Sequence, residues 1–413
     1  MAKGPEYDTV IVGGRVAGGS LALLLARQGR RVVVVDRDGF PSDTLSTHLV
    51  PAIMVPYLER LGVLDDLLRA GFQPLTRTRT YVGECVFEGP AAPGGGFALA
   101  PRRDVLDALV LERAREAGAE VLTRTRAERL LRDDGGTVVG VAVAGEDGAR
   151  ELRGRVVVGA DGKSSKVAEW VEAEKYEAVP ALRPGYYGYF HGVAPLHEPT
   201  LELFFGGDVL GFLFPMRPDE DCLVLELQPE DWETFRSDPK RALLERFAEL
   251  PGMRRRLANA MLEGQVKGAR GVDNYFRVPF GPGWALTGDA AYLKDPSTGL
   301  GMGDALAQSF LLVEALGRFL DGADWNETMA EYQQARDELM MPLYRLTLDF
   351  TTKRDPPPEE LAVLNALLST PSIARSLVYA LPTAFETLLP PPVAARVRAF
   401  AEAFGGLATA AAR

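Results

Sequence analysis

Cysteine and histidine are scarce in this chain of 413 residues, which contains two cysteines and three histidines. Cys85 and Cys222 lie far apart in the sequence, and neither has another cysteine or a histidine at metal-ligand spacing. We therefore expect no metal site and no disulfide framework, and a reducing cytoplasm fits this cysteine usage best. His191 and His197 also lack ligand-spaced partners, so we interpret them as ordinary surface or core histidines.

Long apolar runs and a net basic charge are missing as well. No uninterrupted apolar stretch approaches the roughly 20 residues that a transmembrane helix needs, and no basic segment followed by an apolar run precedes the first expected strand. We expect no membrane span and no secretion. The formal charge is -11, and the arginines are dispersed among acids. Because nonspecific phosphate binding needs a concentrated basic face, a nucleic-acid partner is not expected.

The remaining composition is that of a globular protein. Hydrophobic residues make up 46% and charged residues 25% of the chain, far from a disordered or fibrous composition. A chain of this length exceeds the usual size of one core, so two interlocked domains are expected, with room to bury a large cofactor.

A strand, a glycine turn, a helix and a second strand open the chain. The pattern predicts a short apolar strand at Asp8–Val12, a turn at Gly13–Gly18, a helix over residues 17–28 and a buried parallel strand at Arg31–Val35. Asp36 ends that strand, where a carboxylate can accept hydrogen bonds from both ribose hydroxyls while the pyrophosphate rests on the helix N-terminus. The alternative is a tight turn that binds nothing. A carboxylate closing an apolar strand needs a partner, so we favour a dinucleotide site.

Arg15 occupies the place of the middle glycine in the G-x-G-x-x-G pattern of this turn. The middle glycine normally lets the backbone approach phosphate, so Arg15 either turns its side chain outward or contacts phosphate through its guanidinium. The expected cofactor contacts here are Gly13, Gly14, Arg15, Ala17, Gly18, Asp36 and Arg37.

Two further junctions follow. Arg103 begins a helix with apolar residues at helical spacing; its charge either reaches the pyrophosphate or is simply solvated, although a cation there opposes the helix dipole. Strands are predicted at about 120–123, 137–143 and 151–158, and the last runs into a turn at Asp161-Gly162. Ser164 or Ser165 can cap the next helix.

Residues 283–305 read G-W-A-L-T-G-D-A-A-Y-L-K-D-P-S-T-G-L-G-M-G-D-A. An apolar strand runs into Gly288-Asp289, passes a Pro and Gly turn, and feeds a long helix that begins near Gly299. This arrangement is typical of phosphate or sugar-phosphate binding. Because the N-terminus already carries a separate nucleotide-binding pattern, one dinucleotide contacted from both ends of a long chain suggests FAD.

Taken in order, these patterns resemble the FAD-binding signatures of the class A FAD-dependent monooxygenase family, which has the para-hydroxybenzoate hydroxylase fold and a glutathione-reductase-type Rossmann FAD domain. The resemblance spans about residues 7–350. Matching positions are Gly13, Gly14, Gly18, Asp36, Arg103, Gly159–Gly162, Gly288–Ala291, Pro296, Gly299 and Gly301. Departures are Tyr292, where the family often has His, and Gly303, where Asn is common.

The resemblance implies roles for the later motifs. Asp289 would hold the flavin ribitol, the turn at Pro296–Gly301 would face the isoalloxazine, and Asp161 would organise FAD and nicotinamide binding. Pro296 is a candidate catalytic residue in that turn. The cofactor-binding residues expected in this part of the chain are Gly288, Asp289, Pro296, Gly299, Gly301 and Met302.

The segment Phe40–His48 combines short hydroxyl side chains with a histidine. It resembles the corresponding segment in a subgroup of these flavoproteins that also has an arginine in the glycine turn. We predict that Ser46, Thr47 and His48 contact the pyrophosphate or the flavin edge. His48 is also a candidate for proton transfer near neutral pH. The alternative is an ordered loop that caps the helix after Pro51.

Aromatic residues dominate the strand-like runs between residues 183 and 227, which predict an antiparallel sheet with one face over the cofactor. Candidate substrate contacts are Tyr187, Phe205, Phe212 and Phe214, with Arg217 as an anion contact. Alternatively the rings fill the core of the sheet, which is the safer interpretation for most of them.

We therefore predict an α/β (α+β) fold in which a Rossmann-type FAD-binding domain carries an antiparallel-sheet substrate domain and a C-terminal helical region. The predicted FAD domain is discontinuous and comprises residues 1–75, 97–180 and 270–350. The substrate domain comprises 76–96 and 181–269. Residues 351–413 form the helical region, which covers the active site or makes a dimer contact, so monomer and homodimer both stay open.

The resemblance implies an FAD-dependent monooxygenase of secondary metabolism. NAD(P)H, bound transiently, would reduce FAD, and O2 would form a flavin C4a-hydroperoxide that hydroxylates an aromatic, polyketide-like or apolar small molecule. Alternatives are an FAD-dependent reductase or dehydrogenase of the geranylgeranyl-reductase-like branch, of which Gly211–Pro215 is reminiscent, and a two-component epoxidase supplied with reduced FAD. Halogenase relatives need a lysine ahead of the middle motif, and no lysine lies between Lys3 and Lys163. A regulator that keeps FAD without turnover is least favoured, since a second domain rich in aromatic residues would then have little purpose.

Overall fold

The structure is a computed structural model that describes residues 5–82, 85–91, 95–146, 148–206, 209–352 and 409–411. Residues 353–408, which carry most of the predicted C-terminal helical region, lie outside the described part of the chain.

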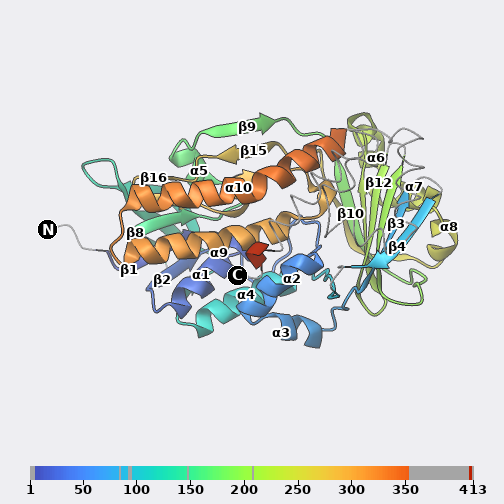
Figure 1. The fold of residues 1–413 in the computed structure, drawn as a ribbon, viewed down its shortest axis with the longest axis horizontal. Coiled ribbons are helices and arrows are strands. Elements are labelled where there is room, and N and C mark those ends of the chain that lie inside the picture. Colours follow the sequence, from blue (N-terminus) through green and yellow to red (C-terminus); the bar gives the residue numbers. More distant parts are fainter. Residues whose placement is uncertain are drawn as a thin grey trace, which may run out of the picture.

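An eight-stranded sheet forms the larger end of the molecule (Figure 1). Its strands are β1 (Tyr7–Val12), β2 (Val32–Val35), β5 (Glu120–Leu122), β6 (Arg126–Arg132), β7 (Val138–Gly145), β8 (Gly148–Gly159), β16 (Phe280–Gly281) and β17 (Trp284–Leu286). The order is β16-β17-β8-β1-β2-β5, and β7 joins β6 to β8. Strand β1 pairs in parallel with β2 and β8. All four valines of β2 are buried, as expected for a parallel strand covered on both faces.

Four long helices cover one face of this sheet: α1 (Val16–Arg27), α4 (Arg103–Glu116), α9 (Gly301–Leu320) and α10 (Trp325–Thr352). Helix α1 packs between α4 and α9, and α9 packs on α10. Helix α9 was expected to begin near Gly299 and begins at Gly301, because Pro296–Thr298 form a 3-10 turn and Gly299 takes the left-handed φ of 67°. Shorter helices are α2 (Val55–Leu61), α3 (Leu64–Arg69) and α5 (Lys166–Trp170).

A seven-stranded sheet forms the other end. Its strands are β3 (Arg77–Val82), β4 (Cys85–Pro90), β10 (Gly185–His191), β11 (Thr200–Gly206), β12 (Val209–Arg217), β13 (Glu220–Glu226) and β14 (Met261–Ala269). They run in the order β14-β10-β13-β12-β11-β3-β4, and every pairing is antiparallel except that of β3 with β11. The predicted mixed α/β fold, with a Rossmann-type parallel sheet and a second, largely antiparallel sheet, is thus confirmed.

The aromatic side chains of β10 alternate between the two faces of this second sheet. Tyr186 and Phe190 join a core with α6 (Trp232–Ser237), α7 (Pro239–Glu249) and α8 (Met253–Arg256), which cover the outer face. Tyr187 and Tyr189 belong instead to the core shared with the larger end. The period of two along a strand therefore turns one aromatic row toward the first sheet.

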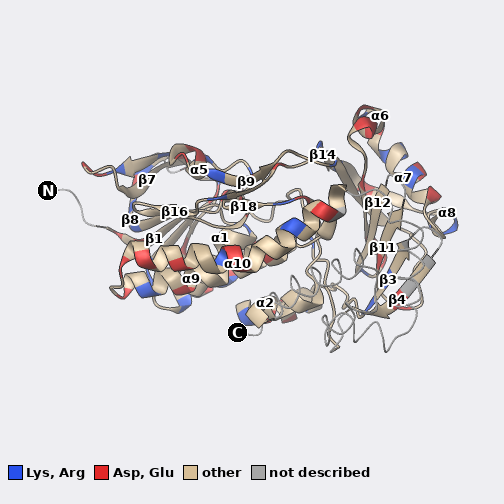
Figure 2. Cartoon of the chain, turned by 45° about the horizontal axis from the view of Figure 1, so that its top comes forward, with Lys and Arg blue, Asp and Glu red and all other residues tan. Residues whose placement is uncertain are grey.

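A small third sheet links the two ends. It consists of β9 (Lys175–Val179), β15 (Asn274–Arg277) and β18 (Tyr292–Leu293). Lysine and arginine are interspersed with aspartate and glutamate over the elements (Figure 2). Among the described helices, none combines the length and the apolar character needed to cross a membrane.

Candidate functional site

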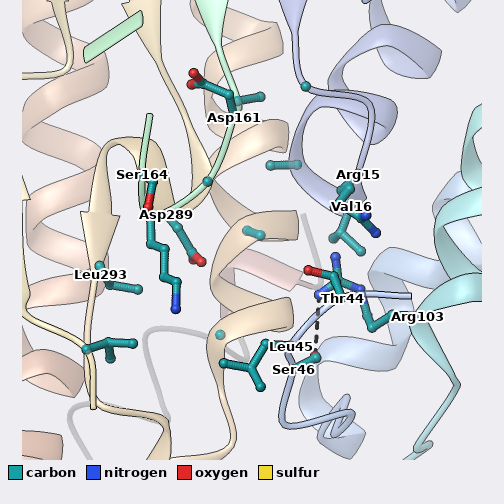
Figure 3. Close-up of a pocket in the computed structure, with 18 of the residues that line it drawn as sticks. Arg15, Val16, Thr44, Leu45, Ser46, Arg103, Asp161, Ser164, Asp289 and Leu293 are labelled. Carbon is teal, nitrogen blue, oxygen red and sulfur yellow. Dashed lines mark hydrogen bonds between the residues drawn. The ribbon is translucent and has the colours of Figure 1, made fainter. Parts of the chain in front are cut away.

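A cavity of about 730 Å³ lies between the two sheets. Its lining comes from the β1–α1 turn, the end of β2, residues 44–47, the start of α4, the β8–α5 turn, strands β10 and β13, and the stretch from Asp289 to Ala305. Figure 3 shows Asp161, Asp289 and Leu293 on one side and Arg15, Thr44, Ser46 and Arg103 on the other. Segments far apart in the sequence thus surround one space.

The β1–α1 turn depends on two glycines. Gly13 has a φ of 102°, and a Cβ there would lie 2.4 Å from the carbonyl oxygen of Ala160. A Cβ on Gly18 would lie 1.9 Å from the carbonyl oxygen of Gly13. The turn can therefore approach the β8–α5 turn only with glycine at both positions. Gly13 and Ala17 line the cavity, whereas Gly14 and Gly18 shape the turn behind it.

Asp36 directly follows β2 and lines the cavity with its neighbour Arg37. Its carboxylate accepts hydrogen bonds from the backbone N–H of Gly14 at 2.7 Å and of Asp38 at 2.9 Å. Burial raises the pKa of Asp36, against the lowering effect of these two amides. The carboxylate is thus held at the strand end, where a ribose would lie in the predicted dinucleotide site.

Arg15 turns its side chain toward the loop after β2. Its guanidinium donates to Asp38 at 3.0 Å, to the Ser42 hydroxyl at 3.2 Å and to the Ser42 carbonyl at 3.1 Å. It also reaches Asp107 Oδ2 at 3.2 Å. The expectations for Arg15 were an outward side chain or a phosphate contact. The structure shows its guanidinium paired with Asp38 and Asp107, on a residue that still lines the cavity.

Asp107 is a buried carboxylate that sequence reasoning missed. It accepts from Arg103 Nε at 3.2 Å, from Arg103 Nη2 at 3.1 Å and from the backbone N–H of Val16 at 3.1 Å, in addition to Arg15. Its position one helical turn after Arg103 was the available signal. Asp107 holds the Arg103 side chain, which is 11% exposed, at the cavity wall. The alternative of a solvated arginine at the helix start therefore does not describe it.

The segment before α2 reaches the cavity only in part. Ser46 and Thr47 line it, and Ser46 Oγ accepts from Arg103 Nη1 at 3.3 Å. His48 is fully buried, is not among the residues that line the cavity, and hydrogen-bonds Tyr189 through Nε2 at 2.7 Å. Burial, with Arg103 nearby, lowers the pKa of His48 to about 3. The imidazole is therefore neutral near pH 7, and its Nε2 is already bonded to the Tyr189 hydroxyl. Its candidate role in proton transfer stays a prediction.

Asp161 and Asp289 line the same cavity from two different turns. The Asp161 carboxylate accepts from the backbone N–H of Lys166 at 2.6 Å and of Val167 at 3.2 Å, and Ser165 caps α5 through the N–H of Ala168 at 2.9 Å. Burial raises the pKa of both aspartates. For Asp289 the nearby cations Arg103, Lys294 and Lys163 oppose that shift.

The turn before α9 fits a large planar ligand. Pro296, Gly301 and Met302 line the cavity, while Gly288 and Gly299 hold the turn in left-handed conformations. A Cβ on Gly301 would meet nothing within 4 Å, so the first turn of α9 leaves open space at the wall. With this space, the Gly13 turn and the Asp36 carboxylate, the residues present fit FAD.

The two departures from the family pattern have structural causes. Tyr292 lies in an aromatic cluster, 4.5 Å from the Phe276 ring and 6.0 Å from the Tyr344 ring between centroids. A Cβ on Gly303 would lie 2.7 Å from Cγ of Met54. Met54 therefore occupies the space that an asparagine side chain would need.

Lys294 and Asp304 form a buried ion pair on the cavity wall that the sequence analysis did not single out. Burial lowers the pKa of Lys294 to about 7, although the Asp289 carboxylate acts in the opposite direction. Glu226, Asp295 and Arg183 also line the cavity and were likewise missed. Glu226 closes an apolar strand as Asp36 does, which was the one signal available for it.

Of the candidate substrate residues, only Tyr187 is among those that line the cavity. Tyr187 lines the cavity and donates its hydroxyl to the Thr44 carbonyl at 3.1 Å. Phe205, Phe212 and Phe214 pack in the hydrophobic core and are not among the lining residues, as the core alternative anticipated. Arg217 stacks on Phe72 at 4.2 Å and donates to Glu220 at 3.2 Å, away from the cavity lining. In the part of the chain that the structure describes, no cluster of His, Cys, Asp or Glu could hold a metal ion.

Residues 6–187 match the family model described as an FAD binding domain. The chain is 27% identical to aklavinone 12-hydroxylase RdmE of Streptomyces purpurascens over 80% of this chain and 66% of that protein, just under two thirds of its length. It is 29% identical to digeranylgeranylglycerophospholipid reductase 2 of Methanothermobacter thermautotrophicus over 76% of this chain and 81% of that protein.

Among solved structures, PqsL of Pseudomonas aeruginosa in complex with 2-aminobenzoylacetate is 25% identical, with a TM-score of 0.69 over 90% of this chain and 98% of that one. The flavin-dependent brominase Bmp2 is 18% identical, with a TM-score of 0.74 over 96% of this chain and 93% of that one. The second likeness shows a common fold.

Proposed function

We propose that this FAD-dependent oxidoreductase is a monooxygenase of the class A type that hydroxylates an aromatic or polyketide-like small molecule with NAD(P)H and O2. One observation carries the proposal. A single cavity runs from Asp36 past Asp289 to Tyr187 and Glu226 on the second sheet. A cofactor held at the first sheet would therefore share its space with a substrate held at the second. The cysteine usage supports a cytoplasmic location.

Each wall of the cavity has its own part in this proposal. The Gly13 turn and the N-terminus of α1 would hold the pyrophosphate, and Asp36 the adenosine ribose. Asp289 would hold the ribitol, and the Pro296 to Met302 stretch would face the flavin ring. Bound FAD would supply the redox chemistry.

The remaining task of the protein is to orient substrate and exclude water. Tyr187 and Val224 from the second sheet, Leu293 from the third sheet and Pro296 from the turn before α9 give the substrate end partly apolar walls. Such walls suit a flat aromatic molecule whose orientation is set by a few polar groups.

Stopped-flow absorption of the FAD-loaded protein mixed with NADPH or NADH tests the proposal. We expect flavin bleaching that a substrate accelerates, followed by oxygen uptake and one atom from labelled O2 in the product. Absence of bleaching, with or without a panel of phenols, quinones and polyketides, contradicts a single-component enzyme. Oxygen insertion that appears only when reduced FAD is supplied points to the two-component alternative.

The second candidate function is reduction of an isoprenoid or other apolar alkene. The similarity to digeranylgeranylglycerophospholipid reductase 2, 29% identical over 81% of that protein, favours it. Anaerobic incubation with a reductant and an isoprenoid alkene would then give a saturated product. Incorporation of labelled oxygen separates the two functions, because only the monooxygenase uses O2 as a substrate.

A further inference from the structure

Two buried carboxyl groups, one from the second sheet and one from the turn before α9, line the substrate end of the cavity. Glu226 is the last residue of β13 and is 1% exposed, and Asp295 directly precedes Pro296 and is 0% exposed. Both belong to the cavity wall, as does Arg183 at the start of the second sheet. The pair thus lies where the second sheet meets the turn that would face the flavin.

Most of the hydrogen-bonding capacity of this pair is unused. Apart from the hydrogen bond that joins the two carboxyl groups to each other, neither carboxyl oxygen of Glu226 has a partner among the described residues, and the same holds for Oδ2 of Asp295. Oδ1 of Asp295 accepts from the backbone N–H of Ser297 at 3.1 Å, and the Asp295 N–H donates to Asn274 Oδ1 at 2.5 Å. Asp295 is therefore held in place with one oxygen left over. Buried polar atoms without partners are costly, so they point to a ligand that completes them.

The charges around the pair indicate which ligand suits it. Burial raises the pKa of Glu226 well above its usual range, the Asp295 carboxylate raises it further, and Arg183 opposes both. Burial also raises the pKa of Asp295. Burial and the hydrogen bond between the two carboxyl groups both favour a single proton held by the pair, in which one carboxyl donates while the other accepts. With one shared proton, the net charge of Glu226, Asp295 and Arg183 is zero.

We propose that Glu226 and Asp295 form a carboxyl pair that anchors the substrate by hydrogen bonds to a hydroxyl or carbonyl oxygen, which selects a neutral phenol or enol over a carboxylate-bearing ring. The inference rests on the proposed function and specifies its substrate class. A carboxylate would meet the remaining negative charge of the pair. A protonated amine would place a second positive charge beside Arg183, whose guanidinium already balances the negative charge of the pair.

Ligand binding to the oxidised, FAD-loaded protein tests this without turnover. The probes are a dihydroxyanthraquinone, the same ring carrying a carboxylate, the same ring carrying an aminomethyl group, and unsubstituted anthraquinone. Binding is followed by the change in flavin absorption. We expect the dihydroxy compound to bind at least about tenfold more tightly than each of the other three. Unsubstituted anthraquinone leaves the carboxyls unpaired, the carboxylate is repelled by the negative charge of the pair, and the ammonium is repelled by Arg183. Equal affinities, or preference for the carboxylate or the amine, overturn the proposal.

Variants separate a hydrogen-bonding role from a structural one. Glu226→Gln keeps a donor and an acceptor and is expected to hold the dihydroxy compound within about threefold of the native affinity. Glu226→Leu is expected to weaken that compound by about 10-fold to 100-fold while leaving unsubstituted anthraquinone unchanged. Asp295→Asn is expected to reduce the discrimination against the carboxylate. Glu233→Gln, on α6 with a side chain 72% exposed, is the matched control.

The outcomes distinguish the two proposals. Preference for the dihydroxy compound without oxygen uptake contradicts the proposed function and leaves the binding site standing. Oxygen uptake with no preference among the probes, or a Glu226→Leu protein that weakens all probes alike, contradicts the carboxyl-pair anchor. If Glu226→Leu fails to retain FAD, the probe selectivity of the native protein and of Asp295→Asn decides the matter.

Discussion

Replacing Asp107 with asparagine should weaken both the fold and FAD binding. The carboxylate is fully buried and accepts four hydrogen bonds of 3.1 to 3.2 Å, from Val16, Arg15 and twice from Arg103. Removing one partner of a buried ion pair costs about 3–5 kcal/mol. The side chains of Arg15 and Arg103 are 22% and 11% exposed, and asparagine keeps one acceptor oxygen. We therefore expect a loss of about 2–3 kcal/mol in the free energy of unfolding.

Urea unfolding of the FAD-free protein measures this loss, and fluorescence titration with FAD measures the second effect. Because Asp107 orients Arg103 at the cavity wall and bonds the first turn of α1, the dissociation constant for FAD should rise by about tenfold or more. Glu112→Gln on the same helix is the control. Its pair with Arg115 is exposed, with side chains 56% and 50% accessible, so a change below about 1 kcal/mol is expected. If Asp107→Asn costs no more than Glu112→Gln, the carboxylate does not organise this site.

Three further changes probe other parts of the site. The folded pKa of His48, about 3, lies below the unfolded value of 6.5, so the unfolded state binds the extra proton and stability falls as pH drops below 6.5. Between pH 7 and pH 5 the native protein should lose about 2 kcal/mol of its free energy of unfolding through His48, and His48→Asn should remove that part of the loss. Urea unfolding at both pH values measures it, and an equal loss in the variant contradicts the low pKa. Gly301→Val should change the free energy of unfolding by less than about 0.5 kcal/mol. It should weaken FAD binding by about tenfold or more, since the valine side chain would enter the cavity. An unchanged FAD affinity in a titration would place the cofactor elsewhere. Asp161→Ala should cost about 1–2 kcal/mol in thermal or urea unfolding through its lost bonds to the α5 backbone; no loss would show that Ser165 caps α5 unaided.

The sequence by itself determined the elements whose causes are local. Gly13 and Gly18 permit one tight turn, the valine run of β2 requires burial on both faces, and the helix that starts at Arg103 follows from apolar spacing. These features depend on neighbours within a few residues and on periodicity, so the Rossmann-type fold and the FAD-binding patterns were readable without coordinates.

Only the tertiary structure decided how side chains from distant segments pair. The partners of Arg15 and Arg103 meet at Asp107 because α1 packs on α4. The burial of His48 against Tyr189 depends on how the second sheet docks.

The same docking divides the aromatic residues of the second sheet. A period of two sends alternate rings to opposite faces, but only packing determines which face meets the cavity and which rings fill the core. It also brings Glu226 to the turn that carries Asp295, two acids whose sequence neighbourhoods give no sign of each other. Each local pattern follows from short-range geometry, whereas the chemistry of the site depends on charges and oxygens that only the folded chain brings together.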